Sequence, residues 1–173
     1  MALTRINNNS LSAVTAAGIP GHGSLVMADH WRLTSDKTDN GDISANLAQV
    51  DETGYATLGT AMSQSSGVFT FPSTGKWIIL ANFSFSVATG DFVQGRIQVT
   101  TDNGSNYGLV AETVMGGATG GNEGNVPAFA FVDVTNTTNV KVKFGVNSLS
   151  SSTLMGRTSD ARTSFMFIRL ADT

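Results

Sequence analysis

Three aspartates stand close together in a polar segment and are the first residues whose spacing could serve chemistry. Asp36, Asp39 and Asp42 lie within one short stretch, and carboxylate oxygens are ligands that Ca²⁺ accepts. Their spacing departs from known calcium-loop patterns, and Lys37 adds a positive charge among them. We therefore expect a solvated turn at this place, with a bound cation as the alternative.

The two histidines, His22 and His30, are eight positions apart. Imidazole nitrogens bind zinc, but a zinc site needs three or four protein ligands, and Asp29 is the one obvious further ligand nearby. His22 stands between two glycines, which indicates an exposed side chain. We predict no metal site and no cofactor.

Catalytic patterns are equally hard to find. The chain contains no cysteine, which excludes a thiolate nucleophile and disulfide bonds. A Ser–His–carboxylate triad can occur in any chain order, but the Gly-x-Ser-x-Gly turn of one large hydrolase class is absent. Glu52, Glu112 and Glu123 fall in or beside predicted turns and suggest no carboxylate pair of the glycosidase kind. The glycine-rich stretch 116–124 lacks the Lys-Ser/Thr ending of a phosphate-binding loop. We predict that the protein is not an enzyme.

Composition limits the partners. Apolar residues make up 40% of the 173 residues, charged residues only 13%, and the formal net charge is −3. No block of basic residues provides a footprint for nucleic acid or an anchor for a membrane surface. No apolar run reaches the roughly 20 residues that span a bilayer, and the first residues lack the apolar core of a secretion signal. We expect neither a nucleic-acid nor a membrane partner.

The stretch 66–87 is the best-defined β segment of the chain. Large apolar residues alternate with other residues along it, and this period of two is typical of a strand. One face is apolar throughout, and the other is apolar in its first half and polar in its second. The first face carries Trp77, Ile79, Ala81, Phe83 and Phe85.

Further short β segments follow, separated by turns rich in Gly, Asn, Asp and Ser. They cover about 92–100, 107–115, 126–134, 140–146 and 163–170, and two more apolar stretches precede residue 66, at 30–33 and 47–58. No segment shows the 3.6-residue period of a helix. Eight to ten short strands with such turns indicate an all-β sandwich. We assign residues 29–173 to this single domain.

Residues 1–28 differ from the rest of the chain. Their apolar residues are too widely spaced to build a core, although each could contact another surface. The segment is therefore either a flexible tail or an extended arm that becomes ordered on a partner. The candidate partner-binding residues are Leu3, Ile6, Leu11, Val14 and Ile19.

The last β segment is apolar on both faces, because Phe165, Met166, Phe167 and Ile168 are consecutive. One face can pack in the core of the sandwich, and the other needs a cover. No helix is predicted that could supply it. Another copy of the chain would cover it, and the alternative is a strand that is merely central in a monomer.

The spacing Phe69-x5-Gly75-x-Trp77-x-Ile79 resembles the core pattern of the C1q/TNF-like jelly rolls. An aromatic closing strand over 165–170 is similar as well, and the resemblance covers roughly residues 28–173. It implies a ten-stranded jelly-roll β-sandwich that forms a homotrimer around an aromatic-rich axis. The candidate trimer interface is Phe165, Met166, Phe167 and Ile168.

The polar arm, the cysteine-free composition and the Ser/Thr/Asn/Gly-rich surface resemble those of bacteriophage virion proteins, an analogy at the level of the fold. We therefore expect a trimeric capsid decoration (cement) protein on the virion surface. Its arm would bind the major capsid protein or another virion protein. The alternative is the receptor-binding tip of a tail fibre, where loops 102–106 and 116–125 would contact a host glycan or receptor. A secreted C1q-like adhesion module fits less well without a secretion signal.

Overall fold

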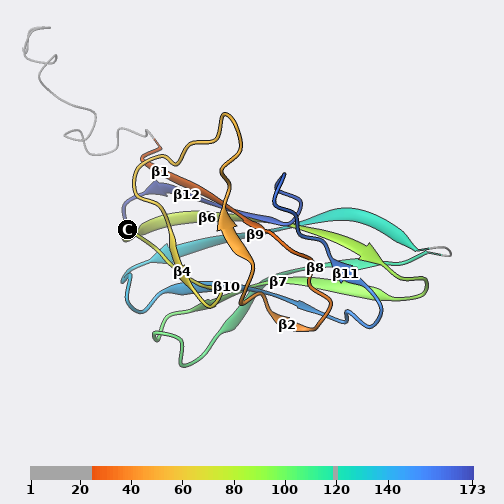
Figure 1. The fold of residues 1–173 in the computed structure, drawn as a ribbon. Coiled ribbons are helices and arrows are strands. Elements are labelled where there is room, and N and C mark those ends of the chain that lie inside the picture. The colour runs from red at the N-terminus through yellow and green to blue at the C-terminus, as the bar shows by residue number, and fades with distance from the viewer. Residues whose placement is uncertain (1–24, 119–120) are drawn as a thin grey trace, which may run out of the picture.

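A computed structural model describes residues 25–118 and 121–173 and shows two antiparallel β-sheets packed face to face (Figure 1). Sheet A contains β1 (Met27–Leu33), β3 (Leu47–Gln49), β6 (Gly75–Val87), β9 (Asn122–Val134), β11 (Thr153–Leu154) and β12 (Ser164–Ala171). Sheet B contains β2 (Gly41–Asp42), β4 (Ser63–Ser65), β5 (Val68–Thr70), β7 (Phe92–Thr100), β8 (Gly108–Gly116) and β10 (Lys141–Asn147). The all-β sandwich predicted from the sequence is confirmed.

The described part of the chain forms twelve strands, where the sequence pattern indicated eight to ten and the resemblance implied ten. In sheet A the order is β9, β6, β12, β1, β3, and β11 pairs with β6 beyond the end of β12. β11 and β12 therefore occupy the same side of β6, interrupted by residues 155–163. In sheet B the order is β4, β5, β10, β7, β8, and β2 pairs with β10 beyond the end of β5. The additional strands are thus short segments that share a side with a longer one.

The core lies between the sheets and is dominated by aromatic rings. The predicted inward face of β6 is confirmed, since Trp77, Phe83 and Phe85 are each at most 1% exposed. Aromatic side chains interlock across the sandwich, as in the stacked pair of Phe144 from β10 and Phe165 from β12, whose ring centroids are 3.8 Å apart. Burial of such rings supplies much of the free energy of folding.

Two residues predicted for the trimer interface belong to this core instead. Phe165 and Phe167 have 0% exposure, and the ring of Phe167 packs 5.1 Å from that of Phe69. Because side chains alternate along a strand, Met166 and Ile168 are the two of these four residues that point out of the sandwich. The assignment of Phe165 and Phe167 to a surface between protomers is therefore corrected.

The glycine-rich stretch 116–124 was expected to be one long loop. β8 extends to Gly116 and β9 begins at Asn122, so the connection between the two strands is shorter than predicted. Glu123 and Gly124 are strand residues paired with β6. Two residues expected in a loop thus belong to a sheet, and the Glu123 side chain stands on it.

The five apolar residues proposed for the arm, Leu3, Ile6, Leu11, Val14 and Ile19, lie outside the described residues. So does His22. The described chain starts with the exposed Leu25 and Val26 and enters β1 at Met27, close to the predicted domain boundary. Among the described residues, no helix has the length and apolar character needed to cross a bilayer.

Gly95 on β7 marks a place where the core leaves no room for a side chain. A Cβ atom at this position would stand 2.5 Å from ring atoms of Phe83. Overpacking of this kind typically costs 1–3 kcal/mol. We predict that Gly95→Ala lowers the free energy of unfolding in urea by about 2 kcal/mol.

Gly116→Ala is the matched control, because a Cβ atom there meets no atom within 4 Å and alanine is favoured over glycine in a strand. Equal stabilities of the two variants would show that the ring of Phe83 moves aside, contrary to the prediction.

Candidate functional site

The outer face of sheet A is organised in rows of side chains set by the pairing register. In one row, Ile78 of β6 lies opposite Phe131 of β9 on one side and Ile168 of β12 on the other. Directly paired residues point to the same face of an antiparallel sheet. The three side chains therefore form an apolar line across three strands.

The adjacent row repeats this arrangement. Leu80 of β6 pairs with Phe129 of β9 and with Met166 of β12. Met166 in turn pairs with His30 of β1, which continues the row towards the edge of the sheet. We call the two rows together the apolar band. Its members are Ile78, Leu80, Phe129, Phe131, Met166 and Ile168.

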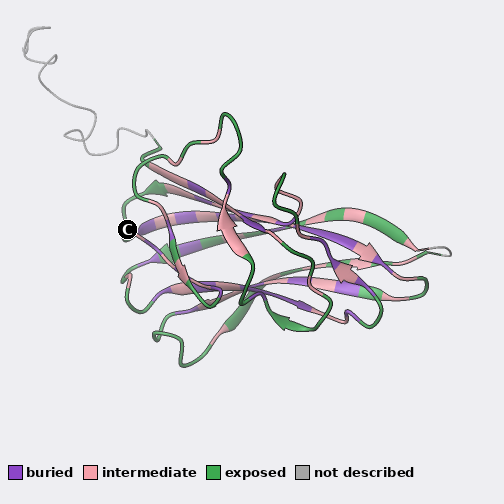
Figure 2. Ribbon diagram, in the orientation of Figure 1, coloured by how far each residue is buried: buried purple, intermediate pink, exposed green. Residues whose placement is uncertain are grey.

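The β9 side of the apolar band is open to solvent. Phe129 is 62% and Phe131 65% exposed, and β9 carries exposed stretches drawn green in Figure 2. Together the two rings present about 250 Å² of apolar surface, whose burial would contribute roughly 6 kcal/mol. Contiguous apolar patches of more than a few hundred Å² mark contact sites with another protein, and the four half-buried members of the band enlarge the patch that the two rings begin.

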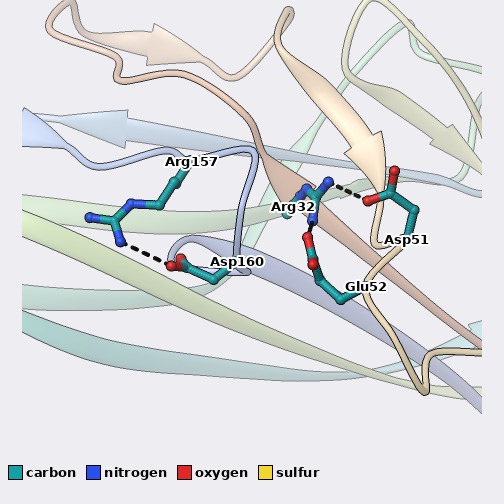
Figure 3. Close-up of polar contacts among 5 residues, drawn as sticks. All are labelled: Arg32, Asp51, Glu52, Arg157 and Asp160. Atoms are coloured by element: carbon teal, nitrogen blue, oxygen red, sulfur yellow. Dashed lines mark hydrogen bonds and ion pairs between the residues drawn. The ribbon is translucent and has the colours of Figure 1, made fainter.

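A charged border limits the band near β1. Arg32 lies one row beyond His30 on the same face and forms ion pairs with Asp51 and Glu52 (Figure 3). Burial lowers the pKa of the guanidinium group, but the two carboxylates raise it by more, so its net pKa is above the ordinary value. Arg32 is therefore charged at neutral pH. Its Nε atom is buried without a partner among the described residues. At the opposite end of the band, Lys76 pairs with Asp133.

His30 is half-buried at the end of its row. Burial lowers the pKa of its imidazole, and the charge of Asp29 raises it only in part. The ring is therefore mostly neutral at pH 7. A neutral imidazole is compatible with the apolar side chain of Met166 beside it.

Asp29, considered from the sequence as a possible metal ligand, is a buried hydrogen-bond centre. Its carboxylate accepts from Tyr55 Oη at 2.7 Å and from Trp31 Nε1, Gln49 Nε2 and the Met62 amide, each at 2.8 Å. Burial raises the pKa of this carboxyl group, and the hydrogen bonds lower it by more, so that the net pKa is below the ordinary value. Through these hydrogen bonds Asp29 holds the segment 49–62 against β1.

The three aspartates at 36, 39 and 42 do not converge. Their separate partners are the Gly156 amide for Asp36 at 2.8 Å, Lys37 for Asp39 at 2.9 Å and Lys143 for Asp42 at 2.8 Å. In the described parts of the chain, no three His, Cys, Asp or Glu side chains group closely enough to hold a metal ion.

Two of the three glutamates considered for catalysis have basic partners that the sequence did not reveal. Glu52 pairs with Arg32, and Glu112 of β8 accepts a hydrogen bond from Arg96 Nε at 2.7 Å. Tyr107, the aromatic residue next to loop 102–106, lies under the ammonium group of Lys143, 4.2 Å from the ring centroid. Its ring is therefore partly covered on one face.

Phe129 and Phe131 are the functional residues that sequence reasoning missed. The stretch Val126-Pro-Ala-Phe-Ala-Phe-Val132 was recognised as a strand, but which alternate set faces outward was not assigned. The available signal was its apolar character at both odd and even positions, which indicates burial on both faces. The structure places the small alanines inward and both phenylalanines outward.

Comparison with known proteins bears on the fold. No family model matches the chain, and no curated protein matches it. Among solved structures, it is similar to the TNF named Eiger from S. frugiperda, with a TM-score of 0.60 and 10% sequence identity over 87% of this chain and 96% of that chain. At this identity the likeness concerns the fold alone. The chain has a TNF-like jelly-roll fold.

Proposed function

We propose that the protein is a non-enzymatic structural protein whose protomers form a homotrimer through the apolar band. The observation that carries the proposal is the exposure of Phe129 and Phe131 in register with four further apolar side chains of sheet A. A second copy of the chain is an economical cover for this face, because it needs no other partner. Met166 and Ile168, which were predicted for the interface from the sequence, lie within the band.

A second exposed apolar stripe, on β8, favours a ring of protomers rather than a twofold dimer. Leu109, Val110 and Val114 of β8 are each about half exposed, and β8 is the edge strand of sheet B beside β9. Contact between two different surfaces of identical chains is heterologous, and it forms a ring when the rotation between neighbours closes and an open filament when it does not. The resemblance to the C1q/TNF-like jelly rolls favours a ring of three.

We further propose that this trimer decorates the capsid of a bacteriophage, with residues 1–28 of each protomer binding the major capsid protein or another virion protein. In support, the described chain begins beside the C terminus, at one end of the sandwich (Figure 1). In a ring about a common axis, the three arms would leave from the same end. Because the three arms are linked through the trimer, binding of one arm raises the effective concentration of the other two at the capsid surface, and three weak contacts give strong overall binding.

Removal of residues 1–24 tests the role of the arm. We expect the truncated protein to remain trimeric and to bind capsid particles at least about 100-fold more weakly, because the multivalent contact is lost. Co-sedimentation with the particles measures binding, and the full-length chain is the control. Undiminished binding of a trimeric truncation would contradict the proposed anchor.

The tip of a tail fibre is the second candidate, favoured by a polar cleft at the end of the sandwich away from the arm. Antibody–gold labelling of intact virions separates the two functions. Gold over the capsid supports decoration, and gold at the tail end alone supports the tip. Virions without label would contradict both.

A further inference from the structure

A cleft with a volume of about 460 Å³ opens on the outer face of sheet A, beyond the apolar band. This size is within the usual range of small-molecule sites. Its floor consists of side chains from β6 and β9, and one wall comes from residues 155–163, the segment that interrupts β11 and β12. The polar residues of the cleft are Asn82, Ser84, Glu123, Asn125, Asp160 and Arg162.

The wall is held in place by backbone contacts. The Met155 amide donates to the carbonyl oxygen of Ser84 at 2.7 Å, and the Ser84 amide donates to Thr163 Oγ1 at 3.1 Å. Both ends of the interrupting segment are therefore fixed to one residue of β6. Because this segment already covers Ser84, a neighbouring sheet that packs on the apolar band cannot lie flat over the cleft.

The floor contains polar groups without partners. Ser84 is only 4% exposed, and its hydroxyl group makes no hydrogen bond within the described residues while lining the cleft. The hydroxyl oxygen itself is reached from the cleft, because it is not among the buried unpaired atoms of the described residues, so it is free to bond to a ligand. Asn82 uses its Nδ2 atom to donate to the carbonyl oxygen of Arg162 at 2.7 Å, so its carbonyl oxygen remains as an acceptor.

The charges in the cleft are balanced. Asp160 forms an ion pair with Arg157 at 3.0 Å (Figure 3). Arg162 contacts the sulfur atom of Met155 at 3.1 Å, and neither Arg162 nor Glu123 has an ion-pair partner in the part of the chain that the structure describes. The free guanidinium group of Arg162 and the free carboxylate of Glu123 cancel in charge, so the cleft favours neither an anionic nor a cationic ligand. Together they place hydrogen-bond donors beside acceptors.

We propose that this cleft binds a carbohydrate of one or two sugar units. Vicinal hydroxyl groups both donate and accept, which suits a carboxylate and an amide oxygen beside a guanidinium group. Glu123 and Asn82 accept from sugar hydroxyls, Arg162 donates to them, and the Ser84 hydroxyl group provides a further hydrogen bond. The side chain of Met155 provides an apolar contact for the ring.

The position of the cleft fits this role. Ser84 of β6 pairs with Asn125 of β9, in the half of sheet A that is far from Lys76. The opposite end of the sheet, near Lys76, is where β12 ends and where the described chain begins (Figure 1). A protein held by its first residues therefore leaves the cleft accessible. The inference does not depend on the trimer, because every lining residue comes from one protomer.

Saturation-transfer NMR with glucose, galactose, N-acetylglucosamine and lactose at millimolar concentration tests the proposal. We expect transfer to the ring protons of at least one sugar. Arg162→Met and Glu123→Ala should each weaken binding about tenfold, the loss expected for a hydrogen bond to a charged group. Glu112→Gln on β8 removes an exposed carboxylate outside the cleft and should leave binding unchanged.

Ser84→Ala is a further test of the site. Loss of the hydroxyl group should weaken sugar binding and leave the melting temperature of the free protein nearly unchanged, because no other described residue bonds to this group. Absence of transfer from every sugar, or transfer that survives Arg162→Met and Glu123→Ala, would overturn the proposal. Sedimentation of the same samples reports the trimer separately, so a monomer that still binds sugar would contradict only the proposed assembly.

Discussion

Phe129→Asp combined with Phe131→Asp is expected to convert the trimer into folded monomers. The two rings are 62% and 65% exposed in the protomer, so their replacement removes little from its own core. In the trimer, the change withdraws about 250 Å² of apolar surface per protomer and places two charges where no partner compensates their burial. Sedimentation equilibrium measures the mass, and circular dichroism verifies the fold.

Thr135→Asp is the control for the added charge. Thr135 is an exposed residue of the turn after β9 and belongs neither to the apolar band nor to the exposed apolar stripe of β8. We expect this variant to remain trimeric. A double variant that sediments like the unmodified protein would show that protomers do not associate through the apolar band.

Asp29→Ala is expected to lower the free energy of unfolding by about 4 kcal/mol, since each buried donor left without its acceptor costs about 1–3 kcal/mol. Trp31, Tyr55, Gln49 and the Met62 amide all lose the same carboxylate. Denaturant unfolding provides the measurement. Asp160→Ala, in an ion pair with Arg157 whose two side chains are 49% and 44% exposed, should change stability by less than about 1 kcal/mol.

Asp29 also predicts a dependence of stability on pH. Its pKa is lower in the folded chain than in the unfolded chain, so its ionised form stabilises the fold above the unfolded pKa. This contribution is lost as the pH falls through the folded pKa. The difference in melting temperature between the unmodified protein and Asp29→Asn should shrink on acidification below about pH 4. A difference that stays constant down to pH 2.5 would contradict this linkage.

Local patterns in the sequence were sufficient for the inward face of β6. Trp77, Phe83 and Phe85 recur with the period of a strand, and a period of two assigns faces without knowledge of any neighbour. In β12, four apolar residues in succession leave the choice of face open. The structure resolves it because Phe165 and Phe167 pack against Phe144 and Phe69 from sheet B, contacts that local sequence does not contain.

The apolar band could not be predicted for a related reason. It exists because Ile78 pairs with Phe131 and Leu80 with Phe129, and this register between distant strands is a property of the whole sheet. The cleft is also a product of register and of the segment that interrupts β11 and β12. Asp29 offered no local signal either, since its donors at Tyr55 and Met62 are 26 and 33 positions away.

The place of β12 between β6 and β1 has a consequence for biosynthesis. The last strand of the chain fills the middle of sheet A and pairs with the first strand, for example Phe165 with Trp31. A nascent chain that still lacks β12 has a gap in the centre of this sheet. Folding of sheet A must therefore wait until β12 has been synthesised, and such long-range pairing is slow. Until then the ribosome holds an incomplete sheet with unpaired strand edges, which makes prematurely terminated chains prone to aggregation.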